Sequence, residues 1–271
     1  MESGVDSAHF AHTLCDYMAS AAYAHNTDSS KAPLAPRALM QQGYDEICED
    51  RDIKAGGSTA CVAVASEDGK LEVANLGDSG FIHIRLNAVY SHSEPQTHAF
   101  NTPYQLSIVP RSMLARAAAF GGAQLCDYPK DADVTHHDLQ PGDVIIMASD
   151  GVWDNLFTHE LLQTVSQYMR KSGAWKKGKD GLRVSGDVWR HIELDYNAKR
   201  PYTLPSAIAS EIAGAARAAS MNTRRDGPFA KEVQRNYPSE NWRGGKLDDI
   251  CVVVVVVSDN RRETDPIESK L

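Results

Sequence analysis

The chain has 271 residues, of which 42% are hydrophobic and 24% are charged, and its formal net charge is −8. A length and composition of this kind are typical of a globular protein with a sizeable core. The acidic balance argues against a nucleic-acid binder and against a protein that docks on acidic membranes, because both need a dominant basic field. No apolar run reaches the roughly 18 residues that cross a bilayer. We therefore expect a soluble protein, and we expect it to be a monomer.

Cysteine usage predicts a reducing compartment. The five cysteines include no C-x-x-C pair, and their odd number leaves no closed set of disulfides. Cys61 and Cys251 lie in apolar, strand-like runs, so we expect buried, reduced thiols there. The first residues, MESGVDSAHF, show neither a secretory apolar region nor an Arg-rich presequence, so no targeting segment is visible and the cytoplasm is the default location.

The first half of the chain predicts helices followed by strands. Apolar residues at intervals of three and four predict one helix over residues 10–24 and a second over residues 36–48. Three short segments rich in β-branched residues and separated by turn signals follow: STACVAVAS, KLEVANLGDS and GFIHIRL. This pattern favours an antiparallel meander. Residues 94–107 are polar and predict an irregular segment, and residues 113–120 predict an Ala-rich helix.

The second half alternates between strand and helix signals. LQPGDVIIMASDG predicts a turn into a buried strand, and FTHELLQTVSQYMRK predicts a helix with Thr158 as a candidate N-cap and Glu160 in its first turn. A helix over residues 206–221 and a loop follow. KLDDICVVVVVVS then predicts a long strand buried on both faces, before a polar tail over residues 259–271.

The segment over about residues 172–203 loses periodicity and is locally basic. It predicts a solvated insertion at the surface, and the alternative is a docking surface for acidic phosphoproteins. The chain shows no internal repeat and no clear boundary, so we expect one domain over residues 1–258.

Acidic residues mark the ends of several strand-like runs. They are Asp78 in ANLGDSG, Asp150 in ASDGVWDN, and Asp248 with Asp249 in GGKLDDI. A lone Asp beside Gly is ordinarily a turn former, because its side chain bonds its own backbone. Several carboxylates at neighbouring strand ends repel one another, so such a cluster holds a hard divalent cation or has raised pKa values. Mg²⁺ and Mn²⁺ suit oxygen ligands of this kind.

Five motifs follow one another along the chain: GGSTACVAV, ANLGDSGFIHIR, FNTPYQLS, GDVIIMASDGVWDN and GGKLDDICVVVV. In this order they resemble the metal-dependent Ser/Thr protein phosphatases of type 2C, most closely their mitochondrial Ptc7-like subgroup. The resemblance runs from about Gly4 to Val257. It implies an α+β fold, an antiparallel β-sandwich flanked by helices, with a dinuclear Mg²⁺ or Mn²⁺ site at one end. It also implies a phosphoprotein substrate, a mitochondrial location, and hydrolysis of phosphoserine or phosphothreonine by a metal-activated water.

Carried over residue by residue, the resemblance implies that Asp150 and Asp248 are ligands of the dinuclear centre. Asp78 matches the position that helps to hold an additional, weaker metal ion. Gly151 and Asp249 stand beside these ligands and would support them without binding the ion. Beyond the metal ligands, the resemblance assigns no catalytic residue.

The family motif with the bridging Asp belongs some dozen residues before GVDSAHF, whereas this sequence starts at Met1. We therefore expect an N-terminally incomplete member of the family, a sandwich lacking its first strands. The bridging Asp, an upstream acidic ligand and a phosphate-binding basic residue would be missing with them. The alternative function is a catalytically inactive pseudophosphatase that acts as a binding or regulatory protein.

We expect the histidines and hydroxyl residues considered next to have structural or solvent-facing roles and not catalytic ones. His136 and His137 are adjacent in an expected strand, so their side chains point to opposite faces and cannot easily share one ion. We expect His83 to face solvent or an interlayer, and His98 to lie in a solvated loop. Ser58 and Thr59 lack a His/Asp partner pattern, which favours a structural role at the start of a strand.

Overall fold

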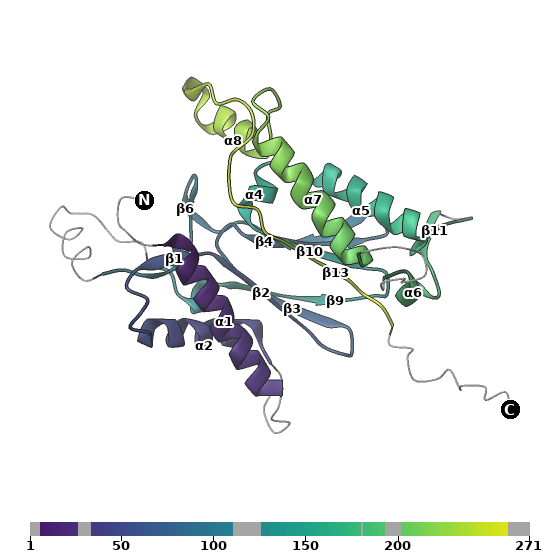
Figure 1. The fold of residues 1–271 in the computed structure, drawn as a ribbon. Coiled ribbons are helices and arrows are strands. Elements are labelled where there is room, and N and C mark those ends of the chain that lie inside the picture. Colours follow the sequence, from purple (N-terminus) through teal and green to yellow (C-terminus); the bar gives the residue numbers. More distant parts are fainter. Residues whose placement is uncertain (1–5, 27–33, 111–125, 180, 193–201, 260–271) are drawn as a thin grey trace. The chain divides into compact units, whose positions relative to one another are not determined.

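The computed structural model describes residues 6–26, 34–110, 126–179, 181–192 and 202–259 (Figure 1). The chain forms two compact units. The first consists of Met1–Gly80 and Ser93–Asp138, and the second of Phe81–His92 and Leu139–Leu271. The Ala-rich helix predicted over residues 113–120 and nearly all of the predicted polar tail lie outside the described residues.

Two helices of the first unit confirm the periodicity of the sequence. They are α1 (Ser7–Asn26) and α2 (Pro36–Glu49), which pack against each other. Pro36 stands in the first turn of α2, where its missing N–H costs no hydrogen bond. Phe10 of α1 and Met40 of α2 are fully buried in one apolar cluster that also includes residues of β2 and β3.

Three antiparallel sheets complete the first unit. The largest has the order β2-β3-β9, formed by β2 (Ala60–Ala65), β3 (Lys70–Leu76) and β9 (Asp133–Asp138). Two short pairs, β1 (Gly56–Ser58) with β8 (Leu106–Ile108) and β6 (Thr97–Ala99) with β7 (Thr102–Pro103), lie partly in the segment predicted as irregular. A 3₁₀ turn, η1 (Pro129–Asp131), precedes β9. His136 and His137 lie in β9 as expected.

The second unit is built on a four-stranded antiparallel sheet in the order β13-β10-β4-β5. Its strands are β4 (Gly80–Arg85), β5 (Ala88–His92), β10 (Val144–Ala148) and β13 (Val252–Val256). The predicted meander is therefore wrong at its third strand, because β3 pairs with β9 and β4 belongs to another sheet. Adjacent strand signals fix strands but not their partners, which are chosen by long-range packing.

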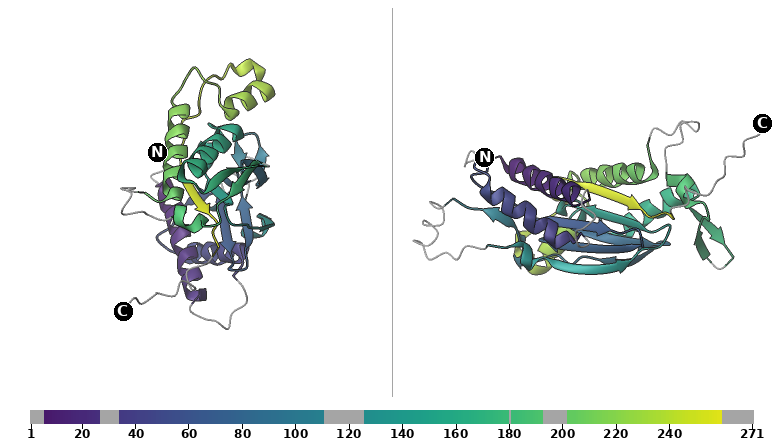
Figure 2. Two further views of the ribbon diagram at one scale, coloured as in Figure 1. Left: turned by 90° about the vertical axis from the view of Figure 1, so that its right-hand side faces the viewer. Right: turned by 90° about the horizontal axis from the view of Figure 1, so that it is seen from below.

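The strand β13 lies at the edge of its sheet, and alternate valines along it are exposed. The prediction that β13 is buried on both faces is therefore wrong. Val253 and Val255 are 51% and 48% exposed, whereas Val256 is buried. The helix α7 packs against β13 (Figure 2). Cys251 is also exposed and Cys61 is only partly buried, so the expectation of a buried thiol at Cys251 is wrong.

The second unit has five helices in its described part: α4 (Asp150–Trp153), α5 (Thr158–Ser172), α6 (Val188–Ile192), α7 (Leu204–Ser220) and α8 (Pro228–Asn236). The first four share one apolar cluster with the sheet, whereas α8 contacts the 3₁₀ turn η2 (Pro238–Glu240). Thr158 is the first helical residue of α5, so the N-cap is Phe157, whose N–H donates to Glu160 Oε2 at 2.8 Å. The helix α8 occupies part of the predicted loop.

The basic segment after α5 is more structured than predicted. A hairpin of β11 (Trp175–Gly178) and β12 (Gly181–Val184) leads into α6. Trp175 is 1% exposed, and its indole N–H donates to the carbonyl of Gly142 at 2.9 Å. The described part of this segment is therefore anchored in the core, while its lysines and arginines are exposed.

A buried polar cluster lies at the start of β10. His83 is fully buried, so it does not face solvent, and its Nε2 lies 2.9 Å from Asp143 Oδ2. Arg85 donates to both oxygens of the same carboxylate, at 2.8 and 2.7 Å. These contacts join β4 to the turn before β10.

Helices and antiparallel sheets together confirm the predicted α+β class. Among the described residues, none of the helices combines the length and the apolar character that a membrane span requires.

Candidate metal centre

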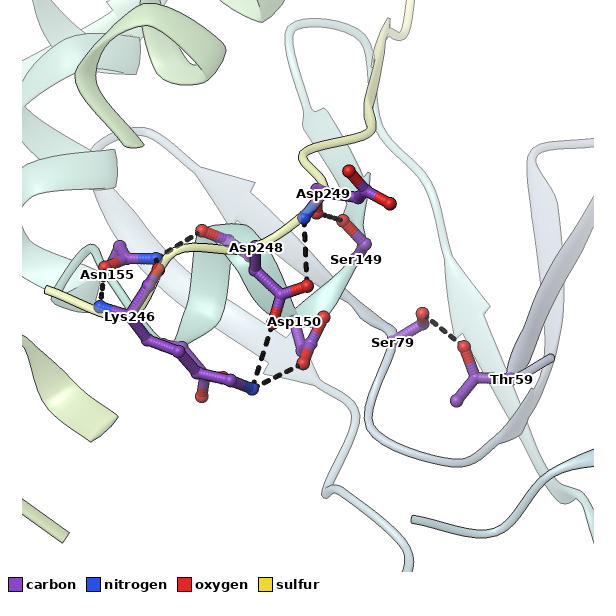
Figure 3. A network of polar contacts seen from close by, with 10 residues as sticks. Thr59, Ser79, Ser149, Asp150, Asn155, Lys246, Asp248 and Asp249 are labelled. Carbon is purple, nitrogen blue, oxygen red and sulfur yellow. Dashed lines mark hydrogen bonds and ion pairs between the residues drawn. The ribbon is translucent and has the colours of Figure 1, made fainter. Parts of the chain in front are cut away.

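The end of β10 is tied to the segment that enters β13. Ser149 follows β10, and its hydroxyl donates to the carbonyl of Asp249 at 2.9 Å and accepts from the N–H of Cys251 at 3.0 Å (Figure 3). The backbone N–H of Ser149 donates to the carbonyl of Cys251 as well. These bonds extend the β10–β13 ladder past its last pair, and they bring Asp150 beside Asp248.

The short helix α4 and its C-cap residue each supply one carboxylate. Asp150 is its first residue, and the N–H of Asp154 donates to the carbonyl of Asp150 at 2.8 Å. Residues four apart lie on one face of a helical turn, so both side chains point the same way. The pair therefore presents two acidic groups to the segment that contains Asp248.

Lys246 lies among these carboxylates. Its Nζ is 2.9 Å from Asp150 Oδ2, 2.6 Å from Asp154 Oδ2 and 3.1 Å from Asp248 Oδ2. The Lys246 side chain is only 16% exposed. Figure 3 shows its stem extended from the β13 side toward Asp150. The ammonium group carries three N–H donors, which matches the number of carboxylates that it faces.

The backbone of Lys246 is held by Asn155, which is fully buried. Asn155 Oδ1 accepts from the N–H of Lys246 at 3.0 Å, and its Nδ2 donates to the carbonyls of Lys246 and Gly151, each at 2.9 Å. One side chain thus fastens α4 to the loop before β13. All polar atoms of the Asn155 amide are engaged in this link.

The electrostatics of the cluster favour a cation. Burial of the Lys246 amine opposes its charged form, but hydrogen bonds to Asp154 and Asp150 outweigh burial and raise the pKa of Lys246 above its usual range. Three carboxylates against one ammonium leave a formal surplus of two negative charges. Within this group of four side chains, the negative charge is therefore only partly compensated.

The donor set fits a hard divalent cation. Asp150, Asp154 and Asp248 each offer one carboxylate oxygen, and these oxygens lie within 4.8 Å of one another. Mg²⁺ and Mn²⁺ prefer oxygen ligands, and Mg²⁺ is usually bound through few carboxylates while it keeps several waters.

The sequence-predicted residues fall into two groups. The second unit brings Asp150 and Asp248 together, with Gly151 and Asp249 next to them. A Cβ on Gly151 would lie 2.4 Å from the carbonyl oxygen of Asp249, so glycine is needed for this approach. The N–H of Asp249 donates to Asp248 Oδ1 at 2.9 Å.

Asp78 belongs to the first unit, where it follows β3. Its assignment as a metal ligand stays a prediction. In the same unit, the hydroxyls of Thr59 and Ser79 are hydrogen-bonded at 2.7 Å (Figure 3). This bond links the start of β2 to the turn that contains Asp78, which agrees with the structural role expected for Thr59.

Sequence reasoning missed three members of the cluster: Asp154, Asn155 and Lys246. Asp154 could have been predicted as a neighbour of Asp150, because it stands four residues after Asp150 at the start of a helix. Lys246 stands two residues before Asp248, so in extended chain the two side chains point the same way. Asn155 gave no signal of its own, since two of the three hydrogen bonds of its amide go to the backbone of Lys246, 91 residues away.

Comparisons with known proteins identify the family. The chain is 33% identical over 257 residues to protein phosphatase 2C homolog 7, mitochondrial, of Saccharomyces cerevisiae, covering 94% of this chain and 66% of the yeast protein. It is 32% identical over 258 residues to protein phosphatase PTC7 homolog fig of Drosophila willistoni, covering 95% of this chain and 69% of that protein. No protein-family model matches the chain.

A solved structure supports the fold. The X-ray structure of the photosystem II phosphatase PBCP superposes with a TM-score of 0.65 at 23% identity, covering 95% of this chain and 83% of that chain. The chain spans 66% and 65% of the length of the first two relatives that it matches, from Saccharomyces cerevisiae and Drosophila ananassae. With about a third of its residues identical to theirs over almost its whole length, the chain belongs to the type 2C protein phosphatases, in the group of the PTC7 homologues.

Proposed function

We propose that this chain belongs to a protein serine/threonine phosphatase that hydrolyses phosphoserine and phosphothreonine in phosphoproteins with the help of Mg²⁺ or Mn²⁺. Asp150, Asp154 and Asp248 would hold a cation. The observation that carries the proposal is that carboxylates almost a hundred residues apart converge on one positive group (Figure 3). The names of the relatives support the substrate class and a mitochondrial location.

A bound cation would supply a water of lowered pKa and compensation for the charge of the phosphate. The protein's own residues position the carboxylates for this purpose. Ser149 fixes the loop that carries Asp248 to the end of β10, and Asn155 fixes the same loop to α4. Asp78 is proposed as a further metal ligand, on the basis of the GDS motif alone.

The test is hydrolysis of a phosphothreonine peptide with Mn²⁺ or Mg²⁺, followed by release of phosphate. Asp150→Asn should lower the rate by about a hundredfold or more, because metal assistance is worth several kcal/mol. Asp45→Asn, at an exposed position on α2, is the matched control and should hydrolyse the peptide like the wild type. Equal rates for wild type and Asp150→Asn would contradict the proposal.

The second candidate is a pseudophosphatase that acts by binding. One observation favours it: Lys246 already compensates part of the charge of the cluster without any metal ion. It predicts no phosphate release with either cation, together with measurable binding of the phosphothreonine peptide. Metal-dependent turnover that Asp150→Asn abolishes would exclude it.

A further inference from the structure

The ammonium group of Lys246 occupies the position where the three carboxylates converge. It forms charge-assisted hydrogen bonds with Asp150 at 2.9 Å and Asp154 at 2.6 Å, and an ion pair with Asp248 at 3.1 Å. A hard cation such as Mg²⁺ binds its oxygen ligands at about 2.0–2.1 Å. An ion shared by these oxygens would therefore need the space that the ammonium group fills.

The backbone of Lys246 cannot retreat to make room. Asn155 holds both its N–H and its carbonyl. The preceding Gly245 is pressed against the end of α7, where a Cβ would lie 2.1 Å from the carbonyl oxygen of Ala219. Only the four-carbon stem of Lys246 is able to rotate, and it has a second favourable contact, since Nζ lies 4.9 Å from the ring centroid of Phe229.

We propose that Lys246 is a built-in cation, which partly neutralises the carboxylate cluster in the metal-free protein and is displaced from it when a divalent ion binds. This inference rests on the proposed function, because it requires that Asp150, Asp154 and Asp248 bind the ion. Lys246 then sets the metal affinity: it lowers the affinity by competing for the same oxygens, and it stabilises the protein when the metal is absent. Lys246 is a positioning residue, since it acts through the carboxylates.

The competition is tested by isothermal titration of MnCl₂ into wild type and Lys246→Met, which keeps the length of the side chain and removes its charge. Lys246→Met should bind Mn²⁺ about tenfold or more tightly, the scale on which one charge about 4–6 Å away shifts an ionic equilibrium. Lys231→Met is the matched control, because Lys231 on α8 pairs with Asp226 and not with the cluster, and it should bind Mn²⁺ like the wild type. If Lys246→Met does not fold, Lys246→Gln takes its place in the same titration.

Thermal unfolding in EDTA gives a readout without metal. Lys246→Met should melt at a lower temperature than wild type in EDTA, since three carboxylates lose their counter-ion. Addition of Mn²⁺ should raise the melting temperature of Lys246→Met by more than it raises that of wild type. A melting temperature in EDTA equal to that of wild type would overturn the proposal.

Displacement itself is seen in wild-type protein by labelling amines and mapping the sites by mass spectrometry. Mn²⁺ should raise the labelling rate of Lys246 and leave that of Lys231 unchanged. Mn²⁺ affinity of Lys246→Met equal to or weaker than that of wild type overturns this inference but leaves the metal site standing. Absence of Mn²⁺ binding in both proteins overturns the proposed function as well.

Discussion

Replacing Asn155 by Ala should destabilise the second unit strongly. The buried amide makes three hydrogen bonds, two to the backbone of Lys246 and one to the carbonyl of Gly151. Truncation leaves one backbone N–H and two carbonyls without this partner, and an orphaned buried group costs about 1–3 kcal/mol. Since water can reach some of these atoms, we expect a loss of about 3 kcal/mol in the free energy of unfolding.

Urea unfolding followed by tryptophan fluorescence measures this loss, because all four tryptophans lie in the second unit. The control is Asn236→Ala at the exposed end of α8, which should change the free energy of unfolding by less than about 0.5 kcal/mol. The two variants remove the same chemical group. A loss for Asn155→Ala as small as that of the control would refute the role of Asn155 as the link between α4 and the loop before β13.

Three further predictions concern other parts of the chain. Gly151→Ala should weaken Mn²⁺ binding about tenfold in a calorimetric titration, because the new Cβ pushes on the carbonyl of Asp249; unchanged affinity would count against this packing. Burial raises the pKa of the Cys61 thiol to about 12, so Ellman's reagent at about pH 8 should modify Cys61 more slowly than the exposed Cys251, and the reverse order would contradict it. Burial alone would raise the pKa of Asp143, but hydrogen bonds from Arg85 and His83 outweigh it and lower that pKa. This carboxylate therefore contributes stability above about pH 4 that is lost as the pH falls. The gap in unfolding free energy between wild type and Asp143→Asn should shrink in urea titrations from about pH 6 to pH 3, and a constant gap would show that the charge is not involved.

Local patterns predicted most of the elements. The helices α1, α2, α5 and α7 and the strand β10 lie where periodicity and turn signals place them, because each has an apolar face that a core must cover. The partner of β4 and the exposure of β13 could not be predicted this way. Both depend on which distant segment packs alongside, and a run of valines fits an edge strand as well as a central one.

The candidate site was predicted in part. Asp150 and Asp248 were found through motif resemblance, and the structure places both against one ammonium group. Lys246 was missed because a search for metal ligands looks for acids, whereas a partly buried acidic cluster also needs a counter-ion. Asn155 was missed because hydrogen bonds to a distant backbone leave no periodic trace in the sequence.

The most direct test is a calorimetric titration of Mn²⁺ into wild type, Asp150→Asn and Asp248→Asn, with Asp249→Asn as the neighbouring control. The Asp249 side chain points away from Lys246, and Asp249 joins the network through its backbone (Figure 3). We expect Asp150→Asn and Asp248→Asn each to lower the affinity by about tenfold or more, and Asp249→Asn to bind nearly like wild type. Wild-type affinity in both Asp150→Asn and Asp248→Asn would show that these carboxylates do not hold the ion.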